Sequence, residues 1–166
     1  MSSEDEAFVE YVAARRDHLF RAAVLLCGDR HQAEDLVQTT LTKLYLGWRR
    51  VSRADIVDAY VRRMLVNAHL DETRRPWRRE RPEADPPERS TSGVEGPDDA
   101  LWNALAALPP KQRRVVVLRH YWGLSVAETA HDLRISEGTV KSQTSAALAA
   151  LRRALRPAPT TCGGSR

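Results

Sequence analysis

Apolar residues recur at intervals of three and four along most of this 166-residue chain, the spacing of amphipathic helices. The first such stripe stops at Gly28, a residue suited to a left-handed helix C-cap. Asp29 is placed to cap a second helix running to about Tyr45, and a third helix begins at about Ile56. No alternating strand pattern of useful length occurs in the sequence. The pattern therefore predicts an all-α fold.

A segment without apolar periodicity divides these helices into two groups. Residues 82–98 are rich in proline, glycine, serine and acidic residues, a composition typical of a flexible linker. We therefore expect two small helical domains, 1–81 and 99–157, followed by a disordered tail, 158–166. A linker of this kind leaves the relative orientation of the two lobes open.

The second lobe contains the pattern of a helix-turn-helix between residues 125 and 151. Ser125 and Glu128 have the spacing of a capping box, and Ser136 is a second N-cap after a break at Arg134. The residues expected in the core are Ala127, Ala130 and Leu133 in the first helix, and Val140, Thr144, Ala147, Leu148, Leu151 and Leu155 in the second. Small or polar residues remain on the outer face near the start of the second helix: Gly138, Lys141, Ser142 and Ser145. This face suits the major groove of DNA, although periodicity alone also allows a plain helical hairpin with a solvated polar side.

Charge is concentrated in two places, although the formal net charge is only +4. Seven arginines and three acids lie between Arg62 and Arg81, and four basic residues and no acid lie between Lys141 and Arg156. A single basic run is usually a solvated face. Two such runs beside a helix-turn-helix favour binding to nucleic acid phosphates.

The remaining composition argues against a secreted protein, a membrane protein and an enzyme. No apolar run approaches the roughly 20 residues of a membrane span, and the polar N-terminus does not resemble a signal peptide. Cys27 and Cys162 lie in different contexts, so we expect no disulfide and a reducing cytoplasmic location. Cys27 and His31 could supply two of the four ligands of a structural zinc site, but no further ligands are evident. The other histidines are scattered along the sequence without partners for acid-base catalysis. We therefore expect no metal, no cofactor and no catalysis.

Two sequence blocks resemble the extracytoplasmic-function group of bacterial sigma factors, and together they cover nearly the whole chain. AEDLVQTTLTKLY, followed by YVRRMLVNAHLDETRR, resembles sigma region 2. LPPKQRRVVVLRHYWGLSVAETAHDLRISEGTVKSQTSAALAALR resembles sigma region 4. The second block alone also resembles effector domains of response regulators, whereas both in this order, without a third region, are highly specific. The resemblance implies a protein that binds core RNA polymerase and promoter DNA and is held by an anti-sigma factor.

The resemblance also implies a role for particular residues. The polymerase-binding candidates are Glu34, Asp35, Gln38 and Leu41. The candidates for minus-10 recognition are Tyr60, Arg62, Arg63, Asn67, Arg74, Arg75 and Trp77. The candidates for minus-35 recognition are Gly138, Thr139, Lys141, Ser142 and Ser145, with backbone contacts from Arg113, Arg114 and Arg119. Asn67 matches the family position that lines the pocket for an unstacked base. An amide suits this pocket because it offers both a hydrogen-bond donor and an acceptor to the edge of a base.

Two positions depart from the family pattern. Tyr60 stands where the family usually has tryptophan, and Ala146 stands where many relatives have arginine, which predicts fewer major-groove contacts. Other readings of single features stay open: the acidic helix face is also typical of a solvated surface, and Trp77 either stacks on a base or packs against its own loop. The rival function is a stand-alone regulator of the response-regulator type, which would leave the N-terminal lobe without a task.

Overall fold

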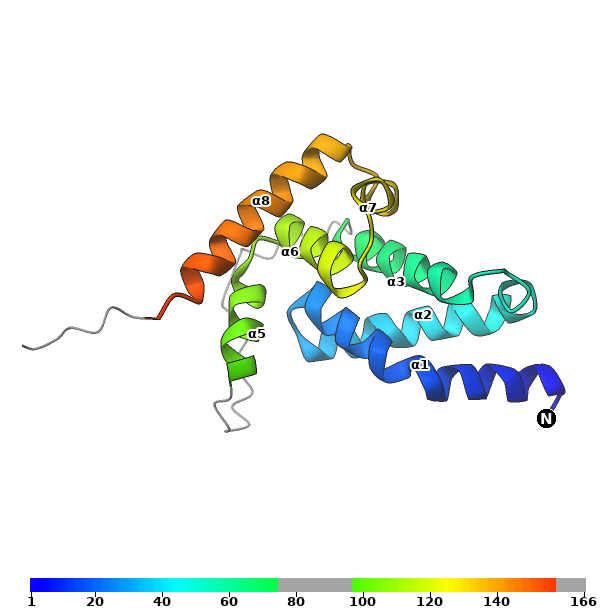
Figure 1. Cartoon of the computed structure of the whole chain (residues 1–166). Helices are drawn as coiled ribbons and strands as arrows, with labels where there is room; N and C mark the ends of the chain where they lie inside the picture. Colours follow the sequence, from blue (N-terminus) through cyan, green and yellow to red (C-terminus); the bar gives the residue numbers. More distant parts are fainter. Residues whose placement is uncertain (75–96, 158–166) are drawn as a thin grey trace, which may run out of the picture.

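The computed structural model describes residues 1–74 and 97–157, and every regular element in these two ranges is a helix, which confirms the all-α prediction. The first lobe contains α1 (Ser3–Cys27), α2 (Arg30–Val51) and α3 (Val57–Thr73). The second lobe contains α5 (Pro97–Ala107), α6 (Pro110–Val116), a π-helical turn η1 (Val117–Tyr121), α7 (Val126–Leu133) and α8 (Glu137–Ala154). Figure 1 shows α1, α2 and α3 forming one layer and α6, α7 and α8 lying on top of it.

The break between α1 and α2 forms as the sequence predicts. Gly28 has a φ of 70° and ends α1, while the Asp29 side chain accepts a hydrogen bond from the backbone N–H of Gln32 at 3.1 Å. Helix α2 continues well past its predicted end near Tyr45, because Trp48 and Val51 extend its buried stripe.

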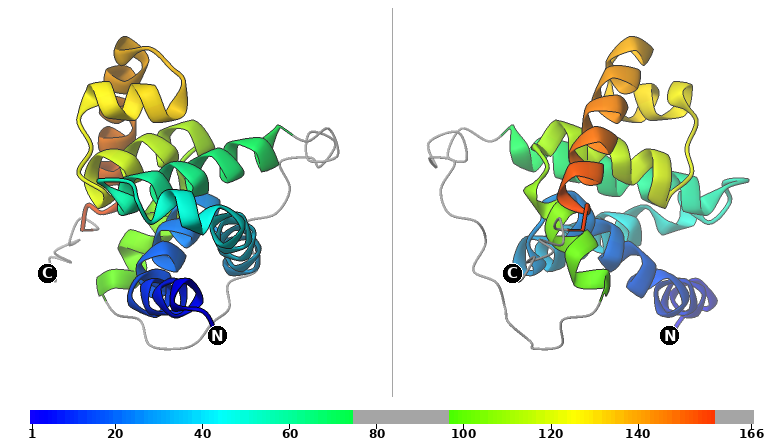
Figure 2. Two further views of the ribbon diagram at one scale, coloured as in Figure 1. Left: turned by 90° about the vertical axis from the view of Figure 1, so that its right-hand side faces the viewer. Right: turned by 60° about the vertical axis from the view of Figure 1, so that its left-hand side comes forward.

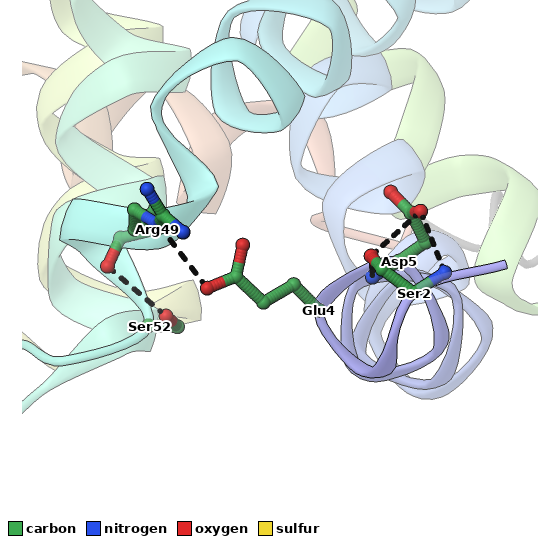
Figure 3. A network of polar contacts seen from close by, with 5 residues as sticks. All are labelled: Ser2, Glu4, Asp5, Arg49 and Ser52. Atoms are coloured by element: carbon green, nitrogen blue, oxygen red, sulfur yellow. Dashed lines mark hydrogen bonds and ion pairs between the residues drawn. The ribbon is translucent and has the colours of Figure 1, made fainter.

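The far end of the first lobe is fixed by a polar network (Figure 3). The Ser2 hydroxyl and the Asp5 carboxylate form a capping box at the start of α1, and their hydrogen bonds lower the pKa of Asp5. Arg49, in the last turn of α2, donates a hydrogen bond to Glu4 at 3.2 Å. The N-terminus of α1 is therefore tied to the C-terminus of α2.

One hydrophobic cluster of the described residues runs through both lobes, and a second, smaller cluster lies within the second lobe: Ala104, Leu108, Val116, Ala147 and Leu151. Buried side chains of α1, α2 and α3, such as Leu26, Leu44 and Leu65, belong to the same cluster as Leu118 in η1 and Val140 in α8. Figure 2 shows the second lobe seated against the first in two further views. The relative orientation that the linker left open is therefore defined by direct packing.

Two residues predicted to be in the core lie on the surface. In α7 the buried positions are Thr129, Ala130, Asp132 and Leu133, and Ala127 is exposed because it lies off this stripe. Leu155 is 43% exposed, since it is the C-cap residue one turn beyond Leu151, the last buried position of α8.

Candidate nucleic-acid interface

Helices α7 and α8 form the predicted helix-turn-helix. The capping box at the start of α7 is present: Ser125 N–H donates to the Glu128 carboxylate at 2.9 Å, and Glu128 N–H donates to the Ser125 hydroxyl at 3.0 Å. Arg134 has the left-handed values φ 56° and ψ 45°, which end α7 abruptly. Ser136 then caps α8 by accepting from Thr139 N–H at 3.1 Å.

The first turns of α8 present a small polar face to solvent. All five residues predicted for minus-35 recognition are exposed: Gly138, Thr139, Lys141, Ser142 and Ser145. The opposite face is held in place by Val140, Ala147 and Leu151, which are buried. The face therefore combines one lysine, hydroxyl groups and the backbone N–H groups of a helix N-terminus, a set that suits phosphates and base edges, while Glu137 adds one negative charge to the first turn.

Two arginines predicted to contact the DNA backbone are turned inward instead. Arg113 donates hydrogen bonds to three backbone carbonyls, those of Leu26 at 3.1 Å, Ala106 at 3.0 Å and Leu108 at 3.4 Å. Arg119 donates to the carbonyl of Leu124, and its Nε is buried without a hydrogen-bond partner among the described residues. DNA contact by these two side chains stays a prediction that depends on their release.

The third arginine of this segment, Arg114, also points toward the first lobe. Its Nε donates to His69 Nε2 at 3.1 Å, and His69 Nδ1 lies 3.9 Å from the Cys27 sulfur. Burial lowers the pKa of Arg114, and the neighbouring charges of Arg113 and Arg74 lower it further. This contact therefore joins the two lobes by a polar interaction beside their common core.

The predicted minus-10 residues lie along α3. Asn67 is exposed, and Tyr60 is half-buried, with its hydroxyl accepting a hydrogen bond from Arg50 at 2.9 Å. Arg74 is exposed at the end of α3. Arg75 and Trp77 lie outside the described residues.

Two further arginines of α3 form an ion-pair cluster with α7. Asp132 of α7 accepts a hydrogen bond from Arg62 Nε at 3.2 Å and lies 3.3 Å from Arg63 Nε. The Asp132 side chain is 1% exposed, while those of Arg62 and Arg63 are 15% and 53% exposed. We call Arg62, Arg63 and Asp132 the interlobe cluster.

Asn67 lies in a hollow beside this cluster. The hollow has a volume of about 460 Å³. It is lined by Arg63 and Asn67 from α3, by Ala130, His131 and Asp132 from α7, and by Arg134. In this arrangement α7 therefore forms one wall of the predicted base-binding site.

The predicted polymerase-binding residues lie on α2. Glu34, Asp35 and Gln38 are exposed, and Leu41 is half-buried. Sequence reasoning missed the large exposed side chains farther along α2, Tyr45 at 53% and Leu46 at 81% exposure. Tyr45 lies within the predicted helix and follows Gln38 and Leu41 at helical spacing, so the same spacing could have placed it on this face.

The described residues hold no group of three or more histidine, cysteine, aspartate or glutamate side chains positioned to bind a metal ion. Within 1–74 and 97–157, no helix combines the length and the apolar character that crossing a membrane requires.

A helix-turn-helix with an exposed polar face, packed on a helical lobe that carries arginines and an amide, defines a two-lobed DNA-binding protein. Comparison with known families gives the particular class. Residues 11–79 match the model of sigma-70 region 2, and residues 98–151 match that of sigma-70 region 4. The chain belongs to the sigma-70 family and is an RNA polymerase sigma factor.

Relatives of known name agree with this family. The chain is 42% identical to the RNA polymerase sigma-E factor of Streptomyces coelicolor, over 89% of this chain and 85% of the relative. It is 33% identical to the ECF RNA polymerase sigma factor SigM of Mycobacterium tuberculosis, over 85% of this chain and 74% of the relative. These similarities confirm the extracytoplasmic-function resemblance.

Solved structures share the fold. The sigma factor RpoE, in its complex with the anti-sigma factor NepR from Bartonella quintana, matches 90% of this chain and 97% of its own length, with a TM-score of 0.69 and 24% identity. CnrH, in complex with the cytosolic domain of CnrY, matches 90% of this chain with a TM-score of 0.58.

Proposed function

We propose that this sigma factor binds core RNA polymerase through the exposed face of α2 and recognises promoters with α3 at the minus-10 element and α8 at the minus-35 element. The observation that carries the proposal is the presence of sigma regions 2 and 4 in one chain, in that order, each with an exposed polar helix face. The chain performs no chemistry of its own, and it would act in the cytoplasm, where polymerase and promoter meet.

The polymerase contact is assigned to α2. Glu34, Asp35 and Gln38 are exposed on one side of this helix, whose opposite side is buried by Leu36, Val37 and other core residues. An acidic face with nearby apolar groups suits a partner surface that presents basic and apolar side chains. Tyr45 and Leu46 extend the face with exposed aromatic and aliphatic area, and we include them in the proposed contact.

The minus-10 contact is assigned to α3. An exposed amide such as that of Asn67 reads the edge of an unstacked base, because it offers a donor and an acceptor in one plane. Arg62, Arg63 and Arg74 supply positive charge for the phosphates of the same strand. Arg75 and Trp77, outside the described residues, belong to the same proposal.

The minus-35 contact is assigned to the start of α8. Lys141 contacts either guanine acceptors or a phosphate, and Ser142 and Ser145 contact base edges or backbone. Gly138 and Thr139 leave room for a close approach of the helix to the duplex. Ala146 is exposed and has no polar group, so we expect weak binding of duplex DNA in the absence of polymerase.

An anti-sigma factor is proposed as a third partner, supported by a solved relative of the same fold, RpoE, that is bound to the anti-sigma factor NepR. The alternative function is a regulator that binds duplex DNA without polymerase. It predicts tight binding of duplex DNA by the isolated protein, and it assigns no function to the region 2 lobe.

The experiment is run-off transcription with purified core polymerase on the promoter upstream of this protein's own gene. Asn67→Ala and Lys141→Ala should each reduce initiation by about tenfold, since a lost base contact costs roughly 1–3 kcal/mol. The matched controls are Asn103→Ala and Lys111→Ala, which remove the same side chains from exposed positions on α5 and α6. A protein that starts no transcript with core polymerase, yet shifts a duplex alone, would refute the proposal.

A further inference from the structure

The interlobe cluster joins residues that the proposed function assigns to DNA. Arg62 and Arg63 are proposed phosphate ligands of the minus-10 strand, yet both lie against the carboxylate of Asp132 in the other lobe, 3.2 Å and 3.3 Å away. A guanidinium paired with a buried carboxylate is not free to bind a phosphate in the same direction. The carboxylate therefore occupies the place of the nucleic acid anion.

We propose that Asp132 makes an autoinhibitory contact: it holds α7 over the minus-10 face of α3, and promoter DNA must displace it before that face can be used. This inference rests on the proposed function, because it concerns the same α3 site. It assigns to Asp132 a regulatory role that the helix-turn-helix pattern does not require.

The position of α7 supports the proposal. Asn67 opens into the hollow whose other wall is formed by Ala130, His131 and Asp132. A strand lying along α3 with a base at Asn67 would need the space that α7 fills. Movement of α7 would therefore free the two arginines and widen the hollow into which the exposed Asn67 opens.

The contact between Asp132 and the two arginines can be broken at a modest cost in free energy, because the carboxylate is only partly hydrogen-bonded. Asp132 Oδ1 is buried without a hydrogen-bond partner among the described residues, because its approach to Arg63 is an ion pair without hydrogen-bond geometry. Arg63 is already half exposed, so it regains full hydration easily when the lobes separate. A buried carboxylate that is only partly satisfied favours its closed position less than a fully bonded one would.

By contrast, the minus-35 face does not depend on this movement. Thr139, Lys141 and Ser142 are exposed while Asp132 is buried in the interlobe cluster. The proposed block therefore acts on one promoter element only.

The test compares the full-length wild-type protein with Asp132→Asn, which keeps the shape of the side chain and removes its charge. Its matched control is Asp17→Asn, which changes the net charge equally at an exposed position on α1. Small-angle X-ray scattering measures the radius of gyration of each free protein. Fluorescence anisotropy measures the affinity for a short single-stranded DNA carrying the non-template minus-10 sequence of the run-off promoter.

We expect Asp132→Asn to increase the radius of gyration and to tighten DNA binding by about tenfold, because removing the blocking state raises the fraction of competent protein. Asp17→Asn should change neither quantity, and Asp132→Glu, which retains the charge, should stay close to wild type. Equal radii for Asp132→Asn and Asp17→Asn would overturn the proposal. So would a larger radius with unchanged DNA affinity, since the cluster would then be merely structural.

A measurement on the wild type covers the case in which Asp132→Asn loses its helical circular dichroism signal. Saturating the wild-type protein with the same DNA should increase its radius of gyration, because binding and opening are linked in both directions. An unchanged radius on saturation would overturn the proposal. Failure of the proposed function gives a different result: no transcript from wild type with core polymerase, whatever the radius of Asp132→Asn.

Discussion

Replacing Arg113 by methionine should destabilise the protein strongly, although charge counting alone would treat this residue as a surface arginine. Its guanidinium donates to the carbonyl of Leu26, in the last turn of α1, and to those of Ala106 and Leu108 at the end of α5. Neither α1 nor α5 has a basic residue in its own last turn. Arg113 therefore satisfies the terminal carbonyls of two helices and places a positive charge at the negative ends of both dipoles.

The magnitude follows from these bonds. A hydrogen bond involving a charged group contributes about 1.5–3 kcal/mol. The two shorter bonds of Arg113, to the carbonyls of Leu26 and Ala106, supply most of this stabilisation. Burial opposes the charged form, as the lowered pKa of Arg113 shows, and offsets part of this gain. We therefore expect Arg113→Met to lower the free energy of unfolding by about 2–3 kcal/mol, and the melting temperature by about 5–10 °C.

Urea denaturation followed by circular dichroism measures this effect. Methionine keeps most of the apolar stem, so the loss reports on the donors rather than on packing. Arg16→Met, at an exposed position of α1, is the control and should stay within about 0.5 kcal/mol of wild type. Arg113→Lys should recover only part of the loss, because an ammonium lacks the planar fork. A stability of Arg113→Met equal to that of Arg16→Met would refute the capping role.

Three further predictions concern stability. Leu118→Ala, at a fully buried position of the common core, should cost about 3 kcal/mol in the same urea assay, because it leaves a cavity between the lobes. Ser125→Ala should cost about 1 kcal/mol by removing the cap that satisfies Glu128 N–H, and a change below 0.3 kcal/mol would count against that cap. Burial and a hydrogen bond to Asp58 raise the pKa of Tyr11, so its contribution is present below about pH 10 and lost as the pH rises above that value. The stability difference between wild type and Tyr11→Phe should therefore shrink as the pH rises above about 10, and a constant difference would contradict this assignment.

Local features of the fold were predictable because their causes lie within a few residues in the sequence. The left-handed cap at Gly28 and the side-chain caps at Asp29, Ser125 and Ser136 all form as expected. Each depends on backbone groups no more than three or four residues away. Burial within α7 was predicted less well: Ala127 is exposed, because an eight-residue helix offers too few turns for periodicity to fix its inward face.

The contacts between the lobes were not predictable in the same way. Arg62 and Asp132 are 70 residues apart in the chain, and Arg113 and Leu26 are 87 apart, so no local pattern pairs them. In the sequence, an arginine that binds phosphate and one that binds a carboxylate or a carbonyl look alike. Charge patterning therefore identified the arginines of α3 as a group, and the family resemblance named those of α6, but neither predicted their neighbours in the folded chain.

The different exposure of the two proposed DNA faces has a consequence for the order of promoter recognition. The polar face of α8 is open while the arginines of α3 are paired, so the closed protein can engage a duplex minus-35 element before α7 moves. A site that is competent only in a minor open form binds with an affinity reduced by the fraction that is open. If the open form is about 10% of the protein, this reduction is roughly tenfold, or about 1.4 kcal/mol, the factor expected for Asp132→Asn. Contacts with polymerase or DNA that favour the open form recover this free energy, and they would thereby confine minus-10 recognition to the assembled promoter complex.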